Sequence, residues 1–158
     1  MMSCRIVSTA WGSSVRKSAL LLAALIPFGA GRLAAQSGKY VVVVNPRNPA
    51  VSVSTSDLSR MYLGKVQGWK MNGRVEPLVP LDQRPDSPLR AVFTERVLHR
   101  SVQETLAYWR QEVYAGRNFP PVEQSEDENL SMVREMVGAI AYVSANADLR
   151  GVKVVRVQ

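Results

Sequence analysis

The sequence predicts a single layered α/β domain with a mostly parallel sheet. Runs rich in β-branched residues alternate with stretches whose apolar residues recur at helical spacing, which is the pattern of strands covered by helices. The chain of 158 residues is 46% hydrophobic and 21% charged, which is ordinary for a globular protein with its own core. Its length fits one domain.

Four stretches are expected to form strands. The first, YVVVVN at Tyr40–Asn45, is a β-branched run followed by Pro46, which predicts a buried, parallel strand. The other three are Val75–Leu81, Ala139–Val143 and Val152–Val157. The segment Lys65–Gly73 contains Gly68 and an Asn-Gly pair, so it is expected to be a loop.

Local signals predict three helices, in addition to the helix after Ser87 that is described below. Ser56 or Thr55 is expected to cap a short helix that Gly64 ends. Two pairs have the spacing of a capping box, in which a serine is followed three residues later by a glutamate: Ser101 with Glu104, and Ser125 with Glu128. The helix that follows Ser125 is expected to end at Gly138.

The stretch Leu81–Leu98 joins the end of a strand to the start of a helix. Apolar residues return after the turn at positions i, i+3, i+4 and i+8, namely Leu89, Val92, Phe93 and Val97. Ser87 before Pro88 is typical of a helix start, because Pro at the first helical position loses only an N–H that has no partner. Such a start can hold an anion, and Arg84 and Arg90 flank it. A simple cap at Ser87 explains the same residues without a ligand.

The first 35 residues have the order of an export signal. Arg5, Arg16 and Lys17 precede an apolar run of ten residues, Ala19–Phe28, and small residues follow up to Ala35. Ten apolar residues are too few to span a bilayer. We therefore expect a signal peptide at 1–35, a periplasmic location, and a mature domain at 36–158 that meets the membrane only through this leader. An uncleaved anchor is the alternative.

Charge and cysteine content exclude several classes of function. Four of the 20 Lys and Arg residues lie in the first 35 residues, so the remaining 16 face 13 Asp and Glu and the formal charge falls from +7 to +3. That modest excess does not indicate nucleic-acid binding. The single cysteine, Cys4, belongs to the leader, so thiol chemistry and disulfides are not expected in the domain.

No motif in the sequence indicates an enzyme, a cofactor or a metal site. There is no nucleophile elbow, no glycine-rich phosphate loop with Lys and no histidine pair. His99 is the only histidine and has no neighbouring ligand residues in the sequence. We therefore expect a binding protein rather than a catalyst.

Four segments together resemble the phosphate-specific periplasmic binding proteins. Arg84–Phe93 is similar to their anion-binding segment, in which an arginine and a Ser-Gly-Thr turn precede a helix. Three further segments match in order: the first strand at Tyr40–Asn45, Met61–Gly64 followed by Trp69, and VGAIAYV at Val137–Val143. This chain has Pro88 and Leu89 where the family has Gly and Thr, and strict spacing places the family's arginine at Gln83.

The resemblance implies one lobe of a type II periplasmic binding protein and a phosphate ABC transporter substrate-binding role. Phosphate or a similar small oxyanion would be held by the backbone N–H groups of Leu89 and Arg90, the Ser87 hydroxyl and the Arg84 guanidinium. The implied partner is a transporter permease, or a second chain that completes the cleft. A ligand-free envelope interaction module with a decayed anion site is the competing hypothesis.

Asn45 and Arg47 are further candidates for ligand contact. They follow the first expected strand, and ligands of open α/β sheets bind beyond the carboxyl ends of strands. A solvated loop explains the same two residues without a ligand.

Overall fold

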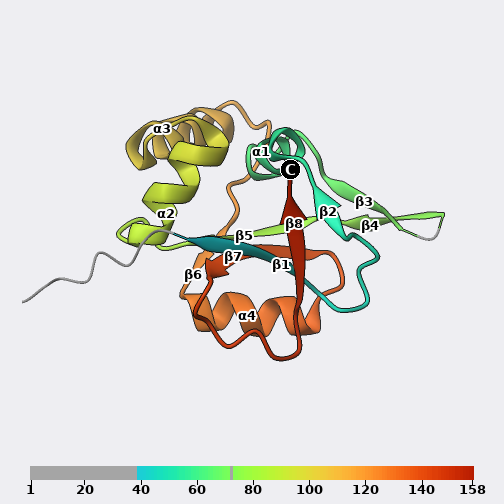
Figure 1. Cartoon of the computed structure of the whole chain (residues 1–158). Helices are drawn as coiled ribbons and strands as arrows, with labels where there is room; N and C mark the ends of the chain where they lie inside the picture. Colours follow the sequence, from blue (N-terminus) through green and yellow to red (C-terminus); the bar gives the residue numbers. More distant parts are fainter. Residues whose placement is uncertain (1–38, 72) are drawn as a thin grey trace, which may run out of the picture. The chain divides into compact units, whose positions relative to one another are not determined.

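The computed structural model describes residues 39–71 and 73–158. The expected signal peptide at 1–35 lies outside these residues. Six strands form one sheet in the order β2-β8-β1-β7-β5-β6 (Figure 1). Their bounds are β1 Tyr40–Val44, β2 Ser52–Val53, β5 Val79–Gln83, β6 Val122–Gln124, β7 Ala139–Ser144 and β8 Lys153–Val157. A separate hairpin consists of β3 Gly68–Met71 and β4 Arg74–Pro77.

The sheet is mostly parallel, which confirms the predicted fold class. Strand β5 runs parallel to β6 and β7, and β2 runs parallel to β8. The expected direction of the first strand was wrong, because β1 is antiparallel to both β7 and β8. Its run of valines reflects burial on both faces, and such burial produces the same sequence whichever way the strand runs.

The direction of β1 decides which loops share an edge of the sheet. Val44, at the carboxyl end of β1, pairs with Ile140 near the start of β7. The carboxyl ends of β5 and β7 lie at the other edge, because these two strands are parallel. The loop after β1 and the start of the helix after β5 are therefore at opposite edges.

Helices cover both faces of the sheet (Figure 1). Helix α1 (Thr55–Tyr62) and helix α2 (Pro88–Phe93), which continues as the π-helical turn η1 (Thr94–Leu98), pack on one face. Helix α4 (Glu126–Glu135) packs on the other face with Leu130 and Val133. Helix α3 (Val102–Tyr114) follows η1, and no helix in the described ranges is long and apolar enough to cross a membrane.

Both predicted capping boxes form, at Ser101 with Glu104 and at Ser125 with Glu128. The cap of α1 was misplaced by the sequence analysis, because Ser54 accepts the Asp57 N–H at 3.0 Å. Neighbouring Ser and Thr residues offer similar acceptors, so sequence alone leaves a one- or two-residue ambiguity.

Helix α4 ends at Glu135, three residues before the expected stop at Gly138. The side-chain amide of Asn45 donates to the carbonyls of Val133 and Arg134 at 2.9 and 2.7 Å. These carbonyls belong to the last turn, where a helix lacks internal donors. A residue from the loop after β1 therefore supplies the hydrogen-bond donors for the last carbonyls of α4. No local signal in the sequence predicts this contact.

The hairpin and β6 correct two further expectations. The segment expected as a loop contains β3, and the stretch expected as one strand from Val75 is divided between β4 and β5. Strand β6 has only three residues and no alternating pattern, so it was not predicted. Trp69 of β3 donates its indole N–H to the Gly138 carbonyl at 3.0 Å and packs against the core.

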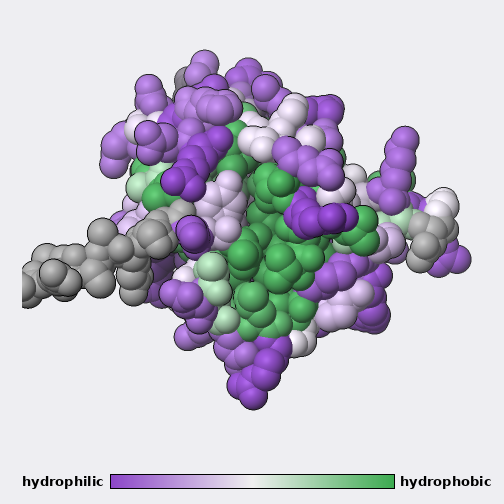
Figure 2. Space-filling model, in the orientation of Figure 1, coloured by the Kyte–Doolittle hydropathy of each residue, from purple (hydrophilic) through white to green (hydrophobic). Residues whose placement is uncertain are grey.

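One face of the molecule carries exposed apolar side chains. Figure 2 shows an apolar area in the middle of the face seen in Figure 1. Strand β8 exposes Val154 and Val157, and both line a surface hollow of about 420 Å³ that Val41 also lines. Exposed apolar areas of this kind are commonly contact surfaces.

Candidate functional site

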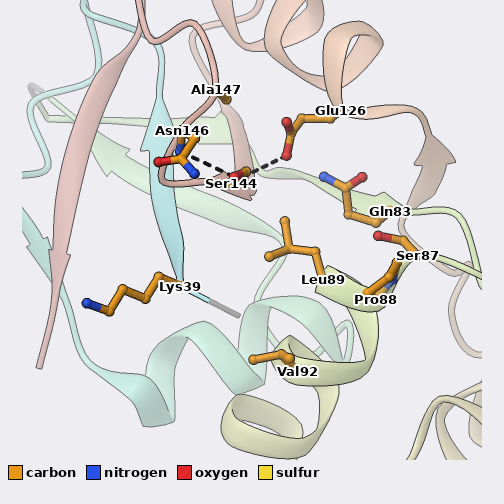
Figure 3. A pocket seen from close by; sticks show the side chains of 10 residues that line it. All are labelled: Lys39, Gln83, Ser87, Pro88, Leu89, Val92, Glu126, Ser144, Asn146 and Ala147. Carbon is orange, nitrogen blue, oxygen red and sulfur yellow. Dashed lines mark hydrogen bonds between the residues drawn. The ribbon is translucent and has the colours of Figure 1, made fainter. Parts of the chain in front are cut away.

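A pocket of about 440 Å³ lies beside the start of α2 (Figure 3). Gln83, at the carboxyl end of β5, and Ser144, at the carboxyl end of β7, line it together with Ser87 and Leu89 of the α2 start. Glu126 of α4 lines the same pocket. The pocket therefore occupies the position beyond the strand ends where open α/β sheets bind ligands.

The start of α2 presents free hydrogen-bond donors. Ser87 has the extended backbone of an N-cap, but its side chain makes no capping hydrogen bond. The Ala91 N–H donates to the Ser87 carbonyl at 3.3 Å, so the N–H groups of Leu89 and Arg90 precede the first helical bond and have no acceptor within the helix. Pro88 has no N–H to offer. Contrary to the interpretation of Ser87 as a simple cap, its hydroxyl has no hydrogen-bond partner in the part of the chain that the structure describes.

The Arg90 side chain points away from the pocket into a buried polar cluster. It is 1% exposed, and its guanidinium contacts Asp82 at 3.0 Å and Glu123 at 2.7 Å and donates to the Gln83 carbonyl at 2.8 Å. Only the backbone N–H of Arg90 remains for a ligand at the helix start. The side chain expected to flank an anion therefore pairs with the buried carboxylate of Asp82 and with the more exposed Glu123 instead.

Asp82 is the centre of this buried cluster. Burial raises the pKa of its carboxyl above the ordinary value, and Arg90 and the hydrogen bond from Tyr142 oppose that effect only in part. The Tyr142 hydroxyl donates to Asp82, and burial with the nearby Asp82 charge raises the pKa of Tyr142. Tyr142 is therefore a neutral donor, and the cluster fixes the end of β5 beneath the pocket.

The remaining predicted site residues lie outside the pocket. The Arg84 side chain is 65% exposed, and its nearest carboxylate is Glu128 at 4.0 Å. Asn45 and Arg47 lie at the opposite edge of the sheet, where Asn45 caps α4 and its side-chain oxygen accepts the Arg47 N–H at 2.9 Å. The structure thus brings together Ser87, Leu89 and the backbone of Arg90, and separates these from Asn45 and Arg47.

Sequence analysis did not identify Gln83, Glu126 or Ser144 as residues of the pocket, nor Lys39 or Asn146. Gln83 and Ser144 end two neighbouring strands, and Glu126 lies in the acidic first turn of α4. Glu126 accepts the Ser144 N–H at 2.6 Å through Oε2. The place of Glu126 in the pocket depends on the packing of α4 on the sheet, so no sequence signal predicts it. For Gln83 there was one signal, because strict spacing places the family's arginine at this position.

No group of His, Cys, Asp and Glu within residues 39–71 and 73–158 has the arrangement of a metal site. The polar groups of the pocket are one carboxylate, amides, hydroxyls and backbone N–H groups, with Lys39 at another wall (Figure 3). Such groups hold a small polar ligand by hydrogen bonds.

No protein-family model matches the chain, and no curated protein sequence matches it. Solved structures do match over 75% of the chain. They include an ABC-type phosphate transport receptor from Vibrio cholerae (17% identity, TM-score 0.58) and PstS from Borrelia burgdorferi (12%, 0.57). A third is a Clostridium perfringens protein described as a phosphate ABC transporter substrate-binding protein with bound phosphate (22%, 0.60).

The chain spans less than half of each of these proteins, 45%, 47% and 44% of their lengths respectively. At such identities the likeness concerns the fold. The resemblance seen in the sequence segments is confirmed at that level: the chain has the α/β fold of one part of the phosphate ABC transporter substrate-binding proteins.

Proposed function

We propose that this chain is an exported solute-binding domain that holds phosphate or a similar small oxyanion at the start of α2. The observation that supports it most directly is the free donor set there: the uncapped Ser87 hydroxyl and the N–H groups of Leu89 and Arg90, all beside a pocket. Hydrogen bonds to an ionised acceptor are stronger than neutral ones, and the positive end of a helix favours negative charge.

The partner we propose is an ABC transporter permease, with a second chain or segment that closes the pocket. The solved relatives named as transport proteins are about twice as long as the part that this chain matches. A ligand enclosed on both sides loses competing water, which strengthens every hydrogen bond to it. Arg84, at the exposed side of the α2 start, would then add positive charge from outside the pocket.

Export through the leader is part of the same proposal, since a solute-binding role requires a location outside the cytoplasm. Mass spectrometry of the protein from the native envelope fraction is expected to show a new N-terminus near Gln36. Intact Met1 in the cytosol would contradict it.

The oxyanion site is tested best at Ser87. Because its hydroxyl makes no capping bond, Ser87→Ala is expected to change the free energy of unfolding by less than about 0.5 kcal/mol. The same change removes a hydrogen bond to a charged ligand, so phosphate affinity is expected to fall by about 1.5–3 kcal/mol, roughly 10- to 150-fold. Calorimetric titration in a buffer free of competing oxyanions measures this loss.

Ser101→Ala is the matched control. Ser101 caps α3 with its hydroxyl, so its replacement is expected to cost about 1 kcal/mol of stability and to leave phosphate affinity unchanged. Equal losses of affinity in both variants, or an unchanged affinity in Ser87→Ala, would remove Ser87 from the site.

A ligand-free interaction module is the second candidate function. The apolar area at Val154 and Val157 favours it, and so does the burial of the Arg90 charge by Asp82 and Glu123. If the unmodified protein shows neither heat nor thermal stabilisation with millimolar phosphate, this candidate replaces the oxyanion site.

A further inference from the structure

Gln83 offers the pocket a hydrogen-bond acceptor. Its side chain is buried, with 4% of the residue exposed, and lines the pocket. The amide nitrogen donates to the Tyr142 carbonyl at 3.0 Å, which fixes the orientation of the amide. No donor in the described part of the chain reaches its side-chain oxygen. The free polar atom of Gln83 is therefore a carbonyl oxygen rather than an N–H.

Glu126 is a second acceptor at the same end of the pocket (Figure 3). It is half-buried, and its Oε2 already accepts the Ser144 N–H at 2.6 Å. Within residues 39–71 and 73–158 it forms no salt bridge. The other carboxylate oxygen of Glu126 thus remains for a hydrogen-bond donor from a ligand. If that donor is cationic, it also balances the negative charge of Glu126.

The charge of Glu126 matters for the class of ligand. A carboxylate in a sheltered pocket repels an anion bound beside it, and partial burial weakens the screening of that repulsion. A ligand that carries a cationic donor next to its anionic group converts the repulsion into attraction.

The volume of the pocket also favours an organic ligand, because about 440 Å³ lies in the range of roughly 300–1,000 Å³ that is usual for such ligands.

We propose that the pocket takes an organic zwitterion, an oxyanion joined to an ammonium group by a short carbon chain. The ammonium group donates to the free oxygen of Glu126 and to the side-chain oxygen of Gln83, and the carbon chain lies against Leu89 and Val92, which line the pocket. The anionic end occupies the donors at the start of α2, so this inference rests on the proposed function. Neither acceptor belongs to that helix.

The test compares three probes on the purified protein by calorimetric titration: O-phosphoethanolamine, monoethyl phosphate and inorganic phosphate. The first two differ only by the ammonium group. O-phosphoethanolamine is expected to bind about 10-fold or more tightly than monoethyl phosphate, the size expected of a hydrogen bond between charged groups.

Glu126→Gln is the variant that assigns this preference. The glutamine keeps an oxygen for the Ser144 N–H, so the fold is expected to persist, which circular dichroism checks. The preference for O-phosphoethanolamine is expected to fall, because only the neutral oxygen of Gln83 still accepts from the ammonium group, while monoethyl phosphate binds as well as before or better because the repulsion is gone.

The outcomes separate the inference from the proposed function. Equal affinity of the unmodified protein for O-phosphoethanolamine and monoethyl phosphate overturns the zwitterion and leaves the oxyanion site standing. An undiminished preference in Glu126→Gln also overturns it, because the cation then does not bind Glu126. If none of the three probes binds, both the inference and the proposed function fail. The comparison of probes on the unmodified protein decides the matter even if the variant does not fold.

Discussion

Replacing Arg90 with Met is expected to destabilise the protein by about 3–5 kcal/mol, because the change removes one partner of a buried ion pair. Arg90 is 1% exposed and contacts Asp82, whose side chain is 5% exposed. Without the guanidinium, the donors to the Asp82 side chain within residues 39–71 and 73–158 are the Tyr142 hydroxyl and the Gln83 N–H. Urea unfolding at pH 7 measures the loss.

Two variants control this experiment. Arg84→Met makes the same change at an exposed arginine and is expected to alter stability by less than about 0.5 kcal/mol. The double variant Arg90→Met with Asp82→Asn is expected to recover part of the loss, because no unpaired charge is then left at that position. Equal destabilisation by the Arg84 and Arg90 changes would show that the buried pair contributes little.

The effect of the Arg90 change depends on pH with a definite sign. Burial already raises the pKa of Asp82, and removal of Arg90 raises it further, because the arginine lowers it. A carboxyl whose pKa is higher in the folded than in the unfolded state favours folding when protonated, and this contribution is lost as pH rises. The destabilisation by Arg90→Met is therefore expected to be largest at neutral pH. It is expected to shrink as the pH falls through the raised pKa of Asp82 in the folded state toward the unfolded pKa of about 3.9. A destabilisation that grows on acidification would contradict this role of Asp82.

Local signals in the sequence account for the features that were predicted correctly. The capping boxes of α3 and α4 need only a serine and a glutamate three residues apart, and both form. The start of α2 at Pro88 likewise follows from a Ser-Pro pair and a helical stripe. In each case the residues that interact are within one turn of each other, so the sequence contains the whole signal.

Features that depend on distant partners were not predictable in the same way. Asn45 caps α4 across 88 positions of sequence, and its role follows only from the antiparallel direction of β1. Arg90 was expected beside an anion, but its partners Asp82 and Glu123 come from two different strands. A charged residue near a helix start has the same appearance in sequence whether it binds a ligand or a buried carboxylate.

The candidate pocket combines both kinds of information. Ser87 and Leu89 were identified from local pattern and resemblance, and they line the pocket. Gln83, Glu126 and Ser144 join them because β5 and β7 are neighbours in the sheet and α4 packs over those strands. Sheet order is set by long-range pairing, so the acceptor side of the pocket was visible only in the structure.

Phe93→Ala is expected to destabilise the protein by about 3–5 kcal/mol, the usual cost of truncating a buried aromatic side chain. Phe93 is 0% exposed and stacks on Tyr142 with ring centroids 3.8 Å apart. Tyr40 and Tyr62 pack against it edge-on at 5.4 and 4.7 Å. Alanine leaves a cavity that three aromatic rings line, and such rings cannot collapse into it without leaving their own contacts.

The chain provides a matched control for this change, since Phe119 is 85% exposed in the loop before β6. Phe119→Ala is expected to alter the free energy of unfolding by no more than about 0.5 kcal/mol. Denaturant unfolding of both variants measures the contrast.

The cavity left by Phe93→Ala also removes support from beneath α2 and from Tyr142, whose hydroxyl donates to Asp82 and whose carbonyl accepts from the Gln83 amide. Phe93→Ala is therefore expected to weaken ligand binding as well, whereas equal stability of the two variants would mean that this aromatic cluster does not hold α2 against the sheet.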